Sequence, residues 1–236
     1  MTEILTLDDI TKIGYLPLDV IVNADFVDFL SVVKTEDAIN LVVSNFPYNK
    51  QTENWERPTD LAAMWKHLDR VLTDVATSVF TSVEPLTSLI RMSNRGNTLY
   101  SDLIWQKEGI TKDFVFADIH RAHENVLIFH TTNSHFKSSV KKINSILTFS
   151  NRWKLYEWII LSFSEPMDIV LINSAWWVNT ALICQQNNRH YIVVEADMEV
   201  CKVALTGLEP KHQKEMTKET TKEKVTEGSL FDMFKV

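Results

Sequence analysis

The sequence lacks long apolar runs and has few cysteines. No stretch approaches the roughly 18 consecutive apolar residues that a membrane-spanning helix requires, and the opening MTEILTLDDITKIGYL has no basic region followed by an apolar segment. We therefore expect a cytoplasmic protein that is neither exported nor embedded in a membrane. The two cysteines, Cys184 and Cys201, lack the spacing of metal ligands, which excludes a cysteine-based zinc site and favours a reducing compartment.

The chain also lacks a positive charge balance. Its 236 residues include 24 Lys and Arg against 31 Asp and Glu, a formal net charge of -7. Proteins that hold nucleic acid by their own electrostatics neutralise phosphates with Lys and Arg, so a DNA contact here needs a local basic patch or a tether. Because residues 209–236 contain six Lys and six acidic residues, the whole net charge lies on residues 1–208.

What the sequence does have is a regular alternation of short apolar runs and helical patterns. With 45% hydrophobic and 23% charged residues, the chain can bury a sizeable core. Strand-like runs such as LDVIV, INLVVS, ENVLIFH, MDIVLI and HYIVVEA alternate with amphipathic stretches such as DLAAMWKHLDRVL. This order predicts an α/β domain over residues 1–208, with a mostly parallel sheet covered by helices on both faces. Function in such sheets lies at the carboxyl ends of the strands.

Glycine is missing at one place where nucleotide-binding folds use it. The stretch VLINSAWWVNTA, residues 170–181, predicts a buried strand that turns into a helix. In many such folds a glycine-rich turn cradles the cofactor at this point. Here Trp176 and Trp177 stand in the turn, so it is an unusual cofactor site, a lost one, or ordinary core.

Several segments, in order, resemble the β group of amino DNA methyltransferases, which modify N6 of adenine or N4 of cytosine. Asn45, Phe46, Pro47 and Tyr48 follow a buried strand, like the family's catalytic Asp, Asn or Ser with Pro-Pro-Tyr. WKHLDRVL, DLIWQK and RAHENVLIF resemble the family's RVL helix, W.K strand and HE.IL.F strand. Residues 165–204 follow the pattern PGD.VLDPF.GSGTT..A...GR..IG.E.D..Y...A without a gap. The resemblance spans residues 18–206 and implies a Rossmann-like methyltransferase fold.

The departures from this pattern lie mostly in the half that would hold S-adenosylmethionine. Glycine lets the backbone approach a cofactor closely, whereas two indoles would fill much of that space. The family's Asp, Pro-Phe and Gly-Ser-Gly are replaced here by Ile172, Asn173, Ser174, Trp176, Trp177 and Val178.

Other landmarks of the resemblance are kept or altered singly. Glu195 remains where the resemblance implies a carboxylate for the ribose hydroxyls, whereas the family's Lys-Pro is replaced by Asn151 and Arg152. In the catalytic half only Phe46 is out of place, so Asn45 and Tyr48 still suit an extruded base. We expect a degenerate donor pocket that binds no cofactor beside a persisting base pocket; a functional donor pocket would bind S-adenosylmethionine.

Two further patterns have both a structural and a functional interpretation. His120 and His123 have His-x-x-His spacing without a third ligand, so we expect a structural role and no metal site. The segment HFKSSVKKINSILTFSNRWK, residues 135–154, lies where the family inserts its target-recognition region. It is either a solvated face or a DNA contact made by Lys137, Lys141, Lys142 and Arg152.

The composition changes at Glu209. Residues 209–228 mix Lys, Glu and Thr, which predicts a flexible charged linker, and residues 229–236 bring apolar side chains back. One helical turn there would present apolar anchors to a partner, and the candidates are Leu230, Phe231, Met233 and Phe234. The peptide SLFDMFKV resembles the C-terminal sliding-clamp-binding peptides of T-even-type phage DNA polymerases. A linker spanning roughly 25 Å would hold the acidic domain at about millimolar concentration beside a clamp on DNA.

We therefore interpret the chain as a catalytically degenerate DNA methyltransferase-like protein. It would be encoded by such a phage and would act in the host cytoplasm as a binding or regulatory protein recruited through a sliding clamp. Two alternatives stay open. One is an active S-adenosylmethionine-dependent N6-adenine or N4-cytosine DNA methyltransferase with an atypical donor pocket. The other is the non-catalytic subunit of a methyltransferase heterodimer.

Overall fold

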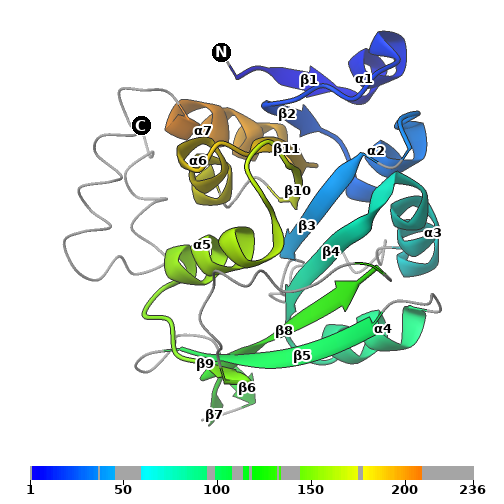
Figure 1. The fold of residues 1–236 in the computed structure, drawn as a ribbon. Coiled ribbons are helices and arrows are strands. Elements are labelled where there is room, and N and C mark those ends of the chain that lie inside the picture. The colour runs from blue at the N-terminus through cyan, green and yellow to red at the C-terminus, as the bar shows by residue number, and fades with distance from the viewer. Residues whose placement is uncertain are drawn as a thin grey trace.

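The computed structural model describes residues 2–36, 38–45, 60–94, 99–107, 114–116, 119–131, 133, 144–174 and 178–208. A nine-stranded sheet with the order β1-β2-β11-β10-β3-β4-β8-β5-β9 runs through it (Figure 1). The pairs β4–β8 and β5–β8 are antiparallel, and the other pairs of this sheet are parallel. The predicted mostly parallel α/β architecture is confirmed.

The longer strands coincide with the apolar runs of the sequence. The strands of the main sheet are β1 (Ile4–Thr6), β2 (Val20–Asn23), β3 (Ile39–Asn45), β4 (Leu72–Ser82), β5 (Leu99–Gln106), β8 (His123–His130), β9 (Ile146–Leu147), β10 (Ile169–Asn173) and β11 (His190–Glu195). A separate pair is formed by β6 (Phe114–Phe116) and β7 (Ile119–His120). Central strands such as β3 and β10 are buried along most of their length, as expected for a sheet covered on both faces.

Most helices begin at a residue that caps the free backbone N–H groups of the first turn. Asp25, Asp60 and Asn151 accept such hydrogen bonds at the starts of α2, α3 and α5. The helices are α1 (Leu7–Ile13), α2 (Phe26–Val32), α3 (Leu61–Val71), α4 (Leu86–Ser93), α5 (Arg152–Phe163), α6 (Val178–Gln186) and α7 (Met198–Leu208). None of the helices described here is both long and apolar enough to cross a bilayer.

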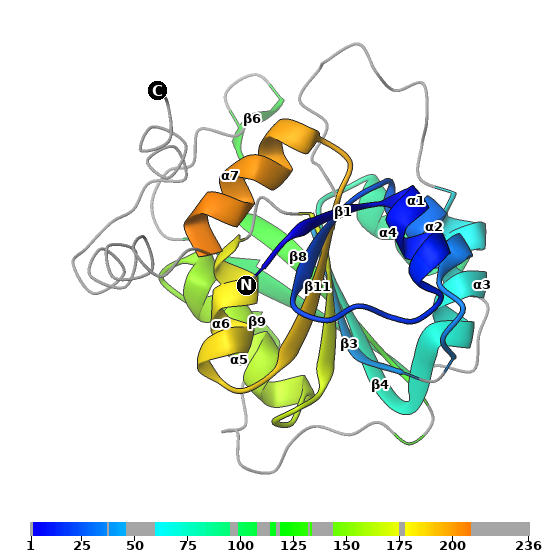
Figure 2. The same cartoon turned by 90° about the horizontal axis from the view of Figure 1, so that it is seen from above.

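The helices form a layer on each side of the sheet, and each layer encloses its own apolar core (Figure 2). Alternate strand residues serve the two cores, because successive side chains of a strand point to opposite faces. Thus Leu41 and Val43 pack with α5, α6 and α7, whereas Val42 packs with α1, α2 and α3. Cys184 and Cys201 are buried on α6 and α7 and are not bonded to each other.

The chain reverses its direction of travel across the sheet between β3 and β10. From β3 it continues through α3 to β4 on one side, and from β10 it continues through α6 to β11 on the other. Open α/β sheets bind ligands beyond the carboxyl ends of the strands at such a switch point. The candidate site residues are therefore Asn45, Asn173 and Glu195, which end β3, β10 and β11.

Candidate functional site

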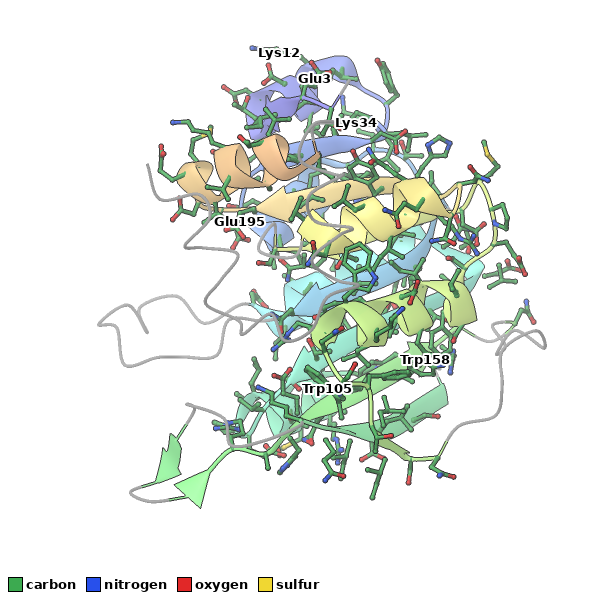
Figure 3. The ribbon with its side chains drawn as sticks, turned by 90° about the vertical axis from the view of Figure 1, so that its left-hand side faces the viewer. Glu3, Lys12, Lys34, Trp105, Trp158 and Glu195 are labelled. Carbon is green, nitrogen blue, oxygen red and sulfur yellow. The ribbon has the colours of Figure 1, made fainter. Side chains whose placement is uncertain are left out.

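The candidate site is the carboxyl edge of the sheet, which divides into two halves. We call the ends of β3 and β4 with the start of α5 the base half, and the ends of β10, β11 and β2 the donor half. The two halves take these names from the base and the methyl donor that the sequence resemblance would place there. Figure 3 labels Glu195 of the donor half and Trp105 beside the base half, well apart along the sheet.

In the base half, Asn45 is held from the side of the sheet that α5 covers. Asn45 on β3 lies in register with Thr81 on β4, so the two side chains share this face. Thr81 Oγ1 donates to Asn45 Oδ1 at 2.9 Å and lies 3.2 Å from the hydroxyl of Tyr156 on α5. Burial raises the pKa of Tyr156, so this hydroxyl stays protonated and keeps its hydrogen for a partner.

A buried ion-pair network lies behind this group. The two terminal nitrogens of Arg152 donate to the carboxylate oxygens of Glu124 at 2.7 and 3.1 Å. Lys107 also pairs with Glu124 at 2.7 Å, and the three side chains are only 7%, 0% and 8% exposed for Arg152, Glu124 and Lys107. The Arg152 guanidinium carbon lies 5.2 Å from the ring centre of Trp105, a cation–π contact. A DNA contact by Arg152 would first have to disrupt this network.

The donor half has an apolar side chain at the position where the resemblance implies an acidic hydrogen-bond acceptor. Ile172 is 1% exposed and belongs to the core under α5, α6 and α7. The next residue, Asn173, turns to the opposite face, where its Nδ2 donates to Ser44 Oγ at 2.8 Å. The strand end therefore has its polar groups directed at the neighbouring strand and its apolar group in the core.

The carboxylate of Glu195 is engaged within the protein. Ser174 adopts φ 93°, a left-handed backbone that favours glycine, and its hydroxyl donates to Glu195 Oε2 at 3.1 Å. Glu195 Oε1 accepts the backbone N–H of Asp197 at 3.0 Å. A ribose that used this carboxylate would share it with both contacts.

The other groups around the donor half are also occupied. Asn23 Nδ2, at the end of β2, donates to the backbone oxygens of Glu195 and Ala196 at 3.1 and 2.9 Å. Burial raises the pKa of the nearby Cys201 thiol to about 11, which makes it a neutral packing group. Among the described residues of this half, Ile172 is apolar, and the polar groups of Asn23, Asn173 and Glu195 already make hydrogen bonds within the protein.

Val178 shows how the last of the replaced glycine positions is used. It begins α6, is buried, and packs against α7 at Gly207. A Cβ atom added at Gly207 would lie 3.1 Å from Val178 Cγ2. The two helices therefore approach closely through a Val–Gly contact, and Val178 serves the core.

Several predicted site residues lie outside the described residues. They are Phe46, Pro47 and Tyr48 of the base pocket, Trp176 and Trp177 of the turn, Lys137, Lys141 and Lys142 of the basic segment, and the C-terminal Leu230, Phe231, Met233 and Phe234. His123 is exposed at the start of β8. Among the described residues, no group of three His, Cys, Asp or Glu side chains is placed to hold a metal ion.

Two residues of the base half were not singled out in the sequence. Thr81 and Tyr156 lie within the apolar runs SVFTS and KLYEWII, where the only signal is a polar atom at a position that the pattern assigns to the core. Lys107 and Glu124 belong to segments that matched the family's W.K and HE patterns, but those matches carried no role for them. The structure brings Thr81 and Tyr156 together beside Asn45, and Lys107 together with Glu124 and Arg152.

Comparison with known proteins identifies the fold. No family model matches the sequence, and no curated protein matches it. The PvuII cytosine-N4-specific DNA methyltransferase superposes with a TM-score of 0.64 at 16% identity, over 90% of this chain and 89% of its own. The M1.HpyAVI complex with SAM gives 0.60 at 16% identity, over 88% of this chain and 99% of its own. The protein TTHA0409 from Thermus thermophilus, complexed with S-adenosyl-L-methionine, gives 0.63 at 21% identity, over 78% and 90%.

Proposed function

We propose that this protein is a DNA-binding member of the methyltransferase fold that has lost methyl transfer and keeps a base-binding edge. It reaches DNA through a sliding clamp that its C-terminal peptide, residues 229–236, holds. Its role is then to bind or shield DNA, or to regulate traffic on the clamp.

The observation that carries this proposal is the state of the donor half. Ile172 places a buried apolar side chain where an acidic acceptor would be needed, and both carboxylate oxygens of Glu195 accept hydrogen bonds from the protein itself. A ribose bound by Glu195 would have to share the carboxylate with Ser174 and the backbone of Asp197, which lowers what each new bond contributes. This arrangement supports a site without cofactor.

The base half supports the second part of the proposal. Asn45 ends β3 at the switch point and is partly exposed. Its side chain is held by a hydrogen bond from Thr81. An amide fixed in this way suits hydrogen bonding to a nucleobase outside the stack. A base half that still binds a nucleobase and a donor half whose polar groups are already bonded would together give DNA binding without methyl transfer.

The charge distribution supports recruitment by a tether. The net charge of -7 disfavours long-range attraction to phosphate, so the domain needs another route to DNA. A clamp-binding peptide on the charged segment 209–228 would supply that route through effective concentration alone.

Calorimetric titration of the full chain with S-adenosylmethionine tests the loss of the donor site. We expect no binding up to about a millimolar, a concentration at which even ligands held by about 4 kcal/mol are detected. The matched variant Trp176→Gly/Trp177→Ser/Val178→Gly tests whether the turn alone blocks the site. Micromolar binding by the natural sequence would refute the proposal and favour an active methyltransferase with an atypical donor pocket.

Gel filtration with a T-even-type phage sliding clamp tests the recruitment. We expect the full chain to co-elute with the clamp, and Leu230→Ala/Phe234→Ala to abolish co-elution because both anchors would be lost. Lys235→Ala is the matched control, since it alters the same peptide without removing an anchor. If the doubly substituted chain still co-elutes, the peptide is not the contact. Methyl transfer that requires an added methyltransferase would instead indicate the heterodimer subunit.

A further inference from the structure

A directed chain of hydrogen bonds fixes the side-chain amide of Asn45. Its hydrogen-bonded members run from Tyr156 of α5 to Thr81 of β4 and then to Asn45, and the paired side chains of Arg152 and Glu124 lie behind Tyr156. The inner members are buried, Tyr156 being 1% exposed and Thr81 fully covered. Their hydrogen bonds are therefore sheltered from exchange with water, and we call this set of five side chains the relay.

The direction of the relay follows from the bond that Thr81 donates to Asn45. A hydroxyl group has a single hydrogen, and because Thr81 donates its own to Asn45 Oδ1, the Thr81 oxygen must accept from Tyr156. The hydrogen of Tyr156 thus goes to Thr81 Oγ1 at 3.2 Å, and the hydrogen of Thr81 goes to Asn45 Oδ1 at 2.9 Å. Glu124 prevents Arg152 from turning away, because it accepts from both of its terminal nitrogens.

The end of the relay determines which face of the amide Asn45 offers to a ligand. Oδ1 is turned toward Thr81, which has no exposed surface, so the oxygen faces the protein. The other end of the same planar group is Nδ2, which carries two N–H donors and no acceptor. The strand end therefore presents donors at the carboxyl edge.

We propose that the base half selects a nucleobase with a keto oxygen at the position of thymine O4 over a base with an exocyclic amine at that position, such as cytosine. Thymine carries an acceptor at O4, whereas cytosine carries an N–H donor at the corresponding N4 position. Two donors cannot share a hydrogen bond, so an amine would meet Nδ2 with no bond formed and both groups desolvated. This inference rests on the proposed function, because it assumes that Asn45 meets a base.

The specificity is the reverse of what an Asn acceptor in an amino-methyltransferase would have. The sequence resemblance alone gives Asn45 the role of accepting from an amine, and the relay removes that role by turning the oxygen inward. Tyr156 and Thr81 are positioning residues in this account, since they act on the base only through Asn45.

The test is fluorescence anisotropy of the full chain with labelled single strands of about twelve nucleotides, a length within the range that one binding domain covers. The strands are oligo-dT, oligo-dU, oligo-dC and oligo-dA. We expect oligo-dT and oligo-dU to bind roughly tenfold more tightly than oligo-dC, the discrimination of one well-placed base contact. Oligo-dU lacks the thymine methyl group, so equal binding of dT and dU assigns the preference to the keto oxygen.

Two variants assign the preference to the amide and to the relay. Asn45→Asp replaces the donors by acceptors, so the order of dT and dC should reverse. Asn188→Asp, in the turn after α6 at the opposite edge of the sheet, makes the same change of charge and should weaken all four strands equally. Tyr156→Phe keeps Asn45 but removes the hydroxyl that donates to Thr81, so Thr81 no longer fixes the orientation of the amide. The ratio of the affinities for oligo-dT and oligo-dC should then approach one. Circular dichroism of each variant at the assay temperature shows that the fold persists.

The outcomes separate this inference from the proposed function. Tighter binding of oligo-dC or oligo-dA than of oligo-dT by the natural chain, or equal binding of all four, would overturn keto selection while leaving DNA binding in place. Binding of none of the strands would overturn both the selection and the base-binding role of the edge. A preference for dT that survives unchanged in Asn45→Asp would also overturn it, because the preference would then come from another part of the chain.

Discussion

The two halves of the carboxyl edge contain similar polar groups but use them in opposite ways. In the base half, buried residues behind the edge hold Asn45 in one orientation and leave part of it available at the surface. In the donor half, Glu195 and Asn173 are bonded to neighbouring residues of the protein, and Ile172 is core. Polar residues at the end of a strand can thus serve either as a surface group held in place or as internal hydrogen-bond partners, and the proposed loss of the donor site rests on the second use.

The difference also explains how the fold tolerates the replaced residues. A strand end with an unpaired buried carboxylate would be costly, and Ile172 avoids that cost. Ser174 keeps a left-handed backbone at φ 93°, where glycine is favoured, and its bond to Glu195 helps to hold it there. The donor half thus gains stability from hydrogen bonds that its polar groups make within the protein.

The largest effect is expected from restoring an acid in the donor half. Ile172→Asp should lower the free energy of unfolding by about 4 kcal/mol, because it buries a carboxyl group among apolar side chains without a partner. Urea denaturation measures this, and Ile172→Val is the control, with a loss of about 1 kcal/mol. A loss for Ile172→Asp as small as that of the control would mean that the position opens to water, and the contrast between the halves would fail.

A somewhat smaller loss of unfolding free energy is expected from disrupting the ion-pair network of the base half. Arg152→Met should cost about 3 kcal/mol, because Glu124 stays buried with only part of its partners. Lys154→Met is the matched control on the same helix, where the pair with Glu157 is 54% and 34% exposed and contributes at most about 0.5 kcal/mol. Equal losses in the two urea titrations would show that Glu124 does not depend on Arg152.

A smaller effect is expected in the pH dependence of folding stability, in the layer to which the base half belongs. Burial lowers the pKa of His130, which packs on Phe163 of α5 and lies 3.2 Å from Thr77 Oγ1. The unfolded chain therefore binds a proton near pH 6.5 while the folded chain does not, so stability is full above that pH and falls as the pH drops below it.

Thermal melting between pH 7.5 and 5 measures this contribution, which should be below about 1 kcal/mol because the ring is only partly covered. His130→Gln should flatten the acid side of the profile. His123→Gln, at an exposed histidine on the same strand, should leave the profile unchanged. Flattening by both variants alike would attribute the sensitivity to charge in general instead of to burial.

The sequence predicts most of the fold because its central strands are long and apolar. Runs such as those of β3, β10 and β11 are buried on both faces, and their alternation with helices is visible without any structure. The edge strands β1 and β9 escaped prediction, since they have three and two residues and no pattern that distinguishes them from loops.

The site is less predictable, because its contacts join distant positions. Asn45 and Glu195 are recognisable from motifs, but Thr81 lies 36 positions from Asn45 and Tyr156 lies 75 positions from Thr81. A polar atom inside an apolar run does not indicate which hydrogen-bond partner it will have. The roles expected for Trp176, Trp177 and the C-terminal peptide stay predictions that the experiments on cofactor and clamp address.

The smallest effect is expected at the contact between Val178 and Gly207, which tests whether the turn of the donor half serves the core. Gly207→Ala should change stability little in the natural chain, because the gain of up to about 1 kcal/mol from helix propensity is offset by the approach of the new Cβ to Val178 at 3.1 Å. In a Val178→Ala background that obstruction is gone, so the same substitution should stabilise the protein by roughly 0.5 kcal/mol. Urea titration of the four chains gives the coupling. Equal effects of Gly207→Ala in both backgrounds would mean that Val178 does not fill the space between α6 and α7.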